Sequence, residues 1–340
     1  MSATNLFEQQ RHNRRRSTLL VALFVLFFAW IGFGADLIFY LQTVNGDPGA
    51  YVHRIPLAGL ASTALALGMA WFSWRRGPKQ ILWASGAWEL VEPSRPEEQQ
   101  LVNVVEEMAI ASGLPRPSIW IVRDDDPNAF ATGTSERDAH VAVTEGLLAA
   151  LSRDQLQAVI AHEMSHIRNH DVKLMTLLAA LVGVLALISE GTWRTMRFGA
   201  RAGGRGGRGG GKKGGGLVLV LIVVWLISVL LAPLISRILA LAVSRKREYL
   251  ADATAAQFTR NPGALAEALE KIEHAAGATK AIKRGSAHLC IADPLGRRVS
   301  QRQGRVADLL ATHPPMAVRI ARLRRMAYQF EHTGVLPEDL

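Results

Sequence analysis

Long runs of apolar residues without a charge are the feature that most restricts the fold of this 340-residue chain. A helix needs about 20 apolar residues to cross a bilayer. Two runs near the start of the chain, Ser17–Ala35 and Ile55–Trp74, meet this requirement, and Gly214–Ser236 meets it further along. Leu174–Ser189 is shorter and marginal. The sequence therefore predicts four membrane-spanning segments rather than one large soluble core.

Basic residues flank the first two apolar runs at their outer ends and orient them in the membrane. These residues are Arg11, Arg14, Arg15, Arg16, Arg75, Arg76 and Lys79. Because basic residues stay on the cytoplasmic side, Ser17–Ala35 and Ile55–Trp74 are predicted to form an antiparallel hairpin with both outer ends in the cytoplasm. The first run is too long for a signal peptide and no convincing cleavage motif follows it, so we expect an uncleaved anchor.

A glycine-rich segment, residues 198–216, carries part of the net charge of +10. Such a segment cannot bury enough apolar surface to fold, so it is predicted to be a flexible linker. Arginine-glycine stretches also occur in tails that bind single-stranded nucleic acid, but here no aromatic residues are interleaved for bases to stack on. We therefore expect no nucleic-acid partner.

The same segment creates a conflict in the predicted topology. If Leu174–Ser189 and Gly214–Ser236 both cross the membrane, the basic residues between Arg194 and Lys213 lie outside, against the positive-inside rule. Either the shorter run does not fully cross, or the first two helices dominate the topology. In both cases the soluble parts before and after this pair stay on one side of the membrane, provided that the two runs behave alike.

Residues 93–172 and the chain after Arg237 have the composition of a soluble domain. The predicted helices are Leu101–Ser112, Ala242–Phe258, Ala264–Ala276 and one that carries Arg319, Ile320 and Leu323; the predicted strands are Ser118–Arg123, Asn128–Thr132 and His140–Thr144. The fold class is therefore a mainly α membrane protein with a small β-sheet.

A further helix is predicted to begin at a capping box formed by Ser152 and Gln155. No proline or glycine occurs between Arg153 and Val182. One continuous helix is therefore predicted to run from the soluble domain into the third apolar run.

This capped helix carries the sequence His162-Glu163-Met164-Ser165-His166. Residues at i and i+4 share a helix face, so both imidazoles can bind one tetrahedral metal ion. Zinc lowers the pKa of a water that it binds toward about 7. Glu163, one position round the helix, is placed to act on that water as a general base. The motif predicts a zinc hydrolase.

Such a site needs a third protein ligand, and Glu248 is the candidate. Asp252 lies one turn further along the same predicted helix, where it can accept a ring N–H from a ligand histidine. Alone, the two acids would be read as offsetting the basic residues 245–247, but the histidine pair lacks a ligand. Because Cys290 is the only cysteine, no internal disulfide is possible and the ligands must be mainly nitrogen and oxygen.

Three further features of the sequence bear on this site. His170 lies four residues after His166, but no acidic cluster accompanies it, so we favour a solvated or supporting role over a second metal. His313 precedes two prolines and is a candidate donor to the oxyanion of the reaction, with a packing role equally open. An exposed strand edge is predicted where an extended substrate could add, at Asn128, Ala129, Phe130 and Ala131.

The order of these motifs resembles that of the HtpX heat-shock proteases, bacterial relatives of the CAAX prenyl proteases. The resemblance covers roughly residues 55–325 and rests on several motifs: His162–His166 with Asp171, Asn128–Gly133, Ser244-Arg245 leading to Glu248 and Ala251-Asp252, Leu289–Ile291, and Thr312–Pro315 with Arg319-Ile320. It implies a gluzincin-type site with His162, His166 and Glu248 as ligands to one Zn²⁺ per chain, Glu163 as base and Asp252 in support. The N-terminal arm and the glycine-rich linker depart from the family pattern.

The resemblance also implies an endopeptidase of the bacterial inner membrane that acts on misfolded or damaged membrane proteins. The catalytic domain and both termini would face the cytoplasm. The expected organisation is a basic arm (1–16), a membrane hairpin (17–74), a first catalytic part (75–173), a second membrane hairpin (174–243) and a second catalytic part (244–340). Unfolded polypeptides and the lipid bilayer are the expected partners.

Two other classes of function compete with this one. In a site-2-type intramembrane protease the histidine pair lies inside a spanning helix, but here charged residues such as Arg153, Asp154 and Arg168 flank the motif closely. A non-enzymatic membrane adaptor or RNA-tethering protein would explain the arginine-glycine linker. It would leave Glu163 and Glu248 unexplained.

Overall fold

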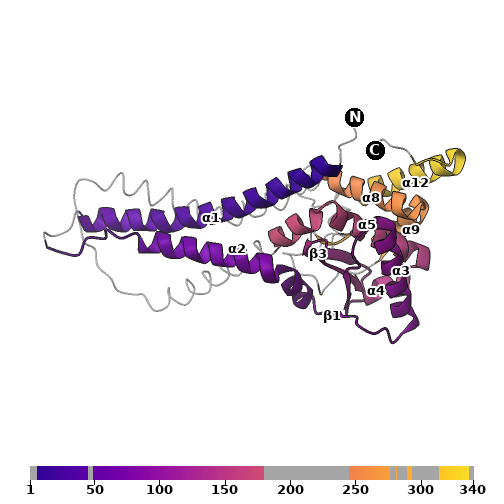
Figure 1. Ribbon diagram of the computed structural model, residues 1–340, viewed down its shortest axis with the longest axis horizontal. Coiled ribbons are helices and arrows are strands. Elements are labelled where there is room, and N and C mark those ends of the chain that lie inside the picture. Colours follow the sequence, from indigo (N-terminus) through magenta and orange to yellow (C-terminus); the bar gives the residue numbers. More distant parts are fainter. Residues whose placement is uncertain are drawn as a thin grey trace. The chain divides into compact units, whose positions relative to one another are not determined.

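The computed structural model describes residues 6–44, 49–179, 245–275, 281, 289–292 and 314–336 (Figure 1). These residues fall into two compact units, one formed by residues 18–73 and the other by residues 74–179 together with the described parts of 1–17 and 240–340. Most of the third apolar run, all of the fourth, the segment 198–216 and His313 lie outside the described residues.

Helices α1 (Leu6–Val44) and α2 (Leu57–Ala84) run antiparallel to each other, as the hairpin prediction requires (Figure 1). Both are long and apolar enough to cross a membrane: the most apolar 18-residue window has a mean hydropathy of 2.3 within Arg15–Val44 and of 1.3 within Leu57–Ala84. A Cβ added at Gly32 would lie 2.6 Å from the carbonyl oxygen of Ala58, so glycine allows the two backbones to approach closely.

Asp36 of α1 caps the beginning of α2. Its carboxylate accepts hydrogen bonds from the backbone N–H groups of Gly59, at 2.6 Å, and Ala58, at 3.2 Å. These N–H groups have no partner within their own helix, so the cap satisfies them. The His53 ring lies 2.7 Å from the same carboxylate. The first helix thus fixes the start of the second.

The other unit contains a four-stranded sheet in the order β1-β2-β4-β3. Strand β2 (Ser118–Val122) is parallel to β4 (Asp138–Thr144), while β3 (Ala129–Ser135) is antiparallel to β4 and lies at one edge. The three strands predicted from the sequence are confirmed. Strand β1 (Ala87–Glu89), which pairs antiparallel with β2, was not predicted because three residues are too few to show an alternating pattern.

Besides the helical residues 171–179 and the ends of α1 and α2, the described part of this unit contains six helices around the sheet and the site. They are α3 (Pro96–Ser112), α4 (Glu145–Ala150), α5 (Arg153–Arg168), α8 (Arg245–Thr259), α9 (Pro262–His274) and α12 (Met316–Thr333). Helix α5 packs against α3, α8, α9 and β3, so it is the central helix of the core. Three of its apolar residues, Leu156, Val159 and Ile160, are buried in this core.

The capping box that begins α5 is confirmed, because Ser152 and Gln155 each bond the other's backbone N–H. The prediction of one continuous helix into the third apolar run is wrong. Helix α5 ends at Arg168, and His170 takes a left-handed conformation with φ of 56° before the chain becomes helical again over residues 171–179. Left-handed geometry is uncommon outside glycine. The break turns Asp171 back toward the side chain of His166.

Candidate metal centre

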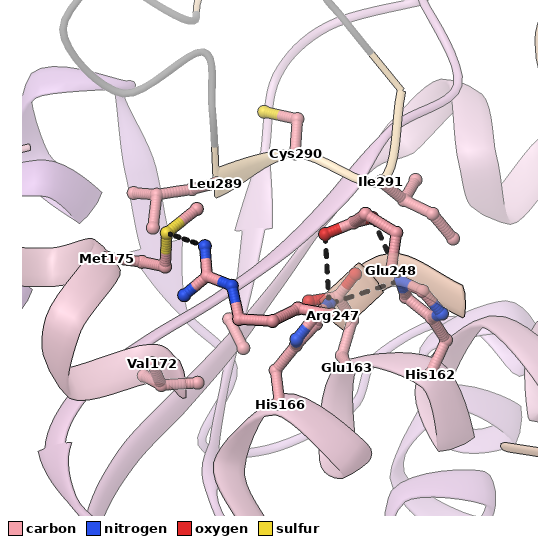
Figure 2. Close-up of a pocket in the computed structure, with 11 residues that line it drawn as sticks. His162, Glu163, His166, Val172, Met175, Arg247, Glu248, Leu289, Cys290 and Ile291 are labelled. Carbon is pink, nitrogen blue, oxygen red and sulfur yellow. Dashed lines mark hydrogen bonds and ion pairs between the residues drawn. The ribbon is translucent and has the colours of Figure 1, made fainter. Parts of the chain in front are cut away.

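His162 and His166 lie one turn apart on α5, and Glu248 faces them from the first turn of α8 (Figure 2). Their ligand atoms all lie within 4.8 Å of one another. The two Nε2 atoms are 3.3 Å apart, and each lies 3.8 Å from a Glu248 oxygen. Tetrahedral zinc with bonds of about 2.0–2.1 Å places its ligand atoms about 3.3–3.4 Å apart. Two nitrogens and one carboxylate at this spacing therefore fit a zinc ion.

The other ring nitrogen of each histidine faces a carboxylate. Nδ1 of His162 lies 3.0 Å from Asp252 Oδ1, and Nδ1 of His166 lies 3.2 Å from Asp171 Oδ2. A carboxylate at Nδ1 fixes the proton there and leaves Nε2 as the metal-binding nitrogen. The arrangement therefore directs both Nε2 atoms toward Glu248. The sequence predicted Asp252 for this place, whereas Asp171 had no assigned role.

Arg319 of α12 stabilises this arrangement by binding Asp252. The sequence predicted no role for it. Its side chain is 0% exposed and makes a two-pronged contact with Asp252, at 2.7 and 2.9 Å. It also donates to the backbone carbonyl of Ile291 at 2.9 Å. The sequence does contain a pattern that indicates a buried Arg319, because this residue lies on the same helix face as Leu323 and Met326, both of which are buried. A charged residue in such an apolar stripe needs a buried partner.

Burial and neighbouring charges shift the pKa values of the site. Burial raises the pKa of Glu163 to about 7 and lowers the pKa of His162. Burial alone would also lower the pKa of His166, but the contact with Asp171 and the charge of Glu248 outweigh it and raise this pKa to about 9. Burial alone would raise the pKa of Asp252, but the charge of Arg319 overcomes that effect and lowers it. The neighbouring carboxylates thus favour the protonated form of His166.

Glu163 is buried beside the cluster, and within the described part of the chain neither of its oxygens has a hydrogen-bond partner of normal geometry. It borders a small cavity of about 20 Å³, which is room for one water molecule. The cavity is also lined by His162, His166 and Glu248. Glu163 is therefore a carboxylate that faces both the ligand atoms and a place for water.

The edge of β3 is less open than the sequence predicted. Residues 289–292 lie along it: Phe130 forms a bridge with Cys290, and Ile291 donates its N–H to the carbonyl of Ala129 at 2.9 Å. The Asn128 side chain donates to the carbonyl of Ala292 at 3.1 Å. The expectation of an exposed edge at Asn128–Ala131 is wrong for the described residues. A local sequence pattern cannot predict such a contact, because Ala292 lies 164 residues after Asn128 in the chain.

His170 does not approach the cluster, since it lies in the turn after α5 with its Nε2 3.5 Å from Glu136 Oε1. Within the described ranges, His162, His166 and Glu248 form the one group of three or more residues able to hold a metal ion. The second-metal alternative for His170 therefore has no set of ligands in this part of the chain.

One buried and one half-buried histidine, a turn apart on α5, lie beside the carboxylates of Glu248 and Glu163, which is the kind of site that metallopeptidases use. The same chain contains two helices long and apolar enough to span a membrane. Comparison with known proteins agrees. Residues 95–327 match peptidase family M48, and the chain belongs to that family.

Within this family the chain groups with the HtpX proteases. A protease HtpX homolog of Thermoanaerobacter pseudethanolicus is 37% identical over 96% of this chain and 99% of its own length. The homologs of Streptococcus gordonii and Listeria monocytogenes are 36% and 38% identical, each over 94% of this chain and 100% of their own. Among solved structures, S. mikatae Ste24p matches at 18% identity with a TM-score of 0.44, over 90% of this chain and 66% of that one.

Proposed function

We propose that this metalloprotease is a zinc-dependent endopeptidase of the bacterial inner membrane that cleaves misfolded or damaged membrane proteins on the cytoplasmic side. The observation that carries the proposal is the convergence of His162, His166 and Glu248 beside Glu163. Zinc bound by these three residues would act as a Lewis acid, polarising a carbonyl and acidifying water.

The protein's own residues supply the rest of the chemistry. Glu163 would take a proton from the attacking water and deliver it to the leaving amine, a role that suits its place beside the ligand atoms and the cavity. Asp252 and Asp171 would hold the two ligand rings in place. We also propose His313, which lies outside the described residues, as a donor to the oxyanion of the reaction.

Substrate would enter as an extended strand next to β3. Ala131 lies two residues after Ala129, so its main chain faces the same side of the strand, and it lines the cavity with Glu163. Because residues 289–292 already contact Asn128, Ala129 and Phe130, we propose that main-chain pairing with substrate begins at Ala131. When substrate binds, residues 289–292 would either move away from β3 or pair with the substrate strand.

The cytoplasmic placement of the catalytic unit is supported by the basic residues at the outer ends of the hairpin, including Arg16, Arg75 and Arg76. The competing hypothesis of a site-2-type intramembrane protease is disfavoured, because α5 is not among the candidate membrane spans and has charged residues at both ends. A cysteine introduced at exposed Arg153 should react with an impermeant thiol reagent only after the cells are opened. Reaction in intact cells would place the catalytic unit outside.

The proposal is tested on protein purified in mild detergent. We expect one zinc per chain and cleavage of an unfolded membrane protein, loss of both after chelation, and recovery when zinc is added back. Cleavage that continues in metal-free protein would contradict the zinc-dependent mechanism.

A further inference from the structure

Arg247 is a buried cation in the candidate active site. Neither the sequence analysis nor the proposed mechanism assigns it a function. It directly precedes Glu248 on α8, and its side chain is only 5% exposed. It borders the same cavity as Glu163 and His166. In Figure 2 its side chain extends from α8 toward Met175, on the side of the site where Val172 and Leu289 are also drawn.

The guanidinium of Arg247 is poorly satisfied for a buried charge. Its Nη2 donates to Met175 Sδ at 3.1 Å, and a thioether is a weak acceptor. Its Nε and Nη1 are buried and have no hydrogen-bond partner among the described residues. Most buried polar groups in native proteins are paired, so this side chain has donors available to an incoming group.

A carboxylate within ion-pair distance does not remove this imbalance. Asp171 Oδ1 lies 3.5 Å from Arg247 Nη1, which is an ion pair but too long for a good hydrogen bond. The same oxygen already accepts a 2.6 Å hydrogen bond from Asn13, and the other oxygen faces His166. Asp171 therefore offsets part of the charge of Arg247 without satisfying its donors.

We propose that Arg247 determines specificity by binding the side-chain carboxylate of an acidic substrate residue next to the scissile bond. The proposal rests on the peptidase function given above. Val172, Met175 and Leu289 make the surroundings apolar, where attraction between opposite charges is stronger than in water. A carboxylate can displace the weak thioether contact and accept hydrogen bonds from two guanidinium N–H groups. A neutral carbonyl stabilises a buried cation less.

The test uses peptides that differ only in having Glu, Gln or Lys at one position beside the scissile bond, with each flanking position examined in turn. Wild-type protein should cleave the Glu peptide about 10- to 100-fold more efficiently, in kcat/KM, than the Gln peptide at one position. Arg247→Gln should remove this preference, and Arg247→Glu should transfer it to the Lys peptide. Met175→Leu, which keeps the volume of the wall, should retain the preference for Glu.

Zinc content is measured for every variant, because Arg247 neighbours a proposed ligand. Equal cleavage of Glu and Gln peptides by wild-type protein at all positions would overturn the proposal. So would an Arg247→Gln variant that loses zinc and slows on all peptides alike, since Arg247 would then only support Asp171.

A binding measurement separates this proposal from the proposed function. In the Glu163→Gln background, zinc-loaded protein should bind the Glu peptide about 10-fold more tightly than the Gln peptide, and Arg247→Gln should abolish the difference. This result does not depend on turnover. If wild-type protein cleaves nothing yet the binding preference is present, the peptidase mechanism fails and the acidic subsite stands; equal binding of both peptides refutes the subsite.

Discussion

The side-chain amide of Asn13 donates a 2.6 Å hydrogen bond to Oδ1 of Asp171, a residue 158 positions later in the chain. The same amide donates to the backbone carbonyl of Asn169 at 3.0 Å, so Asn13 holds the turn that follows α5. Asp171 in turn faces Nδ1 of His166. The beginning of the first helix is therefore one hydrogen bond away from the carboxylate that orients a proposed metal ligand.

Replacing Asn13 should weaken metal binding although the residue is far from the motif in sequence. Asn13→Leu removes both donors while keeping similar bulk, so Asp171 is free to move and His166 is less well oriented. Partners of this kind typically change metal affinity about 10-fold or more. We expect a zinc dissociation constant at least about 10-fold higher, measured by competition with a chelator. Arg11→Ala, at an exposed position of the same helix, is the control; an equal effect of both variants would contradict this role for Asn13.

Removing Arg319 should destabilise the catalytic unit. Arg319→Met leaves Asp252 buried without its cation, and breaking a buried pair costs about 3–5 kcal/mol. The measurement is urea unfolding of the metal-free protein in detergent. The double variant Arg319→Met with Asp252→Leu removes both charges and should recover much of this loss, while still failing to hold zinc tightly. A double variant as unstable as the sum of the single changes would show that the pair is not coupled.

Glu98 should give the protein an acid-dependent part of its stability. Its carboxylate accepts hydrogen bonds from the backbone N–H of Ser94 and from the side chain and backbone N–H of Arg95 at the start of α3, and these bonds lower its pKa from 4.5 to about 2. A lowered pKa stabilises the folded state above pH 4.5, and the contribution is lost as the pH falls toward 2. Glu98→Gln should therefore lower the free energy of unfolding by about 1–3 kcal/mol at pH 7, with a difference that shrinks below pH 4.5. A difference independent of pH would refute the charged cap.

Much of the site could be predicted because its parts are local patterns. The spacing of His162 and His166, the capping box at Ser152 and the second i, i+4 pair at Glu248 each follow from the period of one helix. The three longer strands follow from the alternation and clustering of apolar residues. These features depend on neighbours in the sequence, so the sequence alone carries them.

The remaining features depend on contacts between distant segments. Residues 289–292 cover the edge of β3, and Asn13 reaches Asp171, through pairings that no local pattern encodes. The end of α5 before His170 lacks the usual glycine or proline signal. Arg319 could have been noticed as a charge on an apolar helix face, but its partner Asp252 could not be identified from spacing.

The most direct test of the proposed mechanism is Glu163→Gln, with zinc content and proteolysis measured on the same detergent-purified sample. Glutamine preserves the shape of the side chain but cannot accept a proton, and loss of a general base typically slows a reaction about 10²- to 10⁴-fold. We predict one zinc per chain, as in the wild type, and cleavage of an unfolded membrane protein reduced by at least about 100-fold. Full activity with zinc retained would contradict the assignment of Glu163 as the catalytic base.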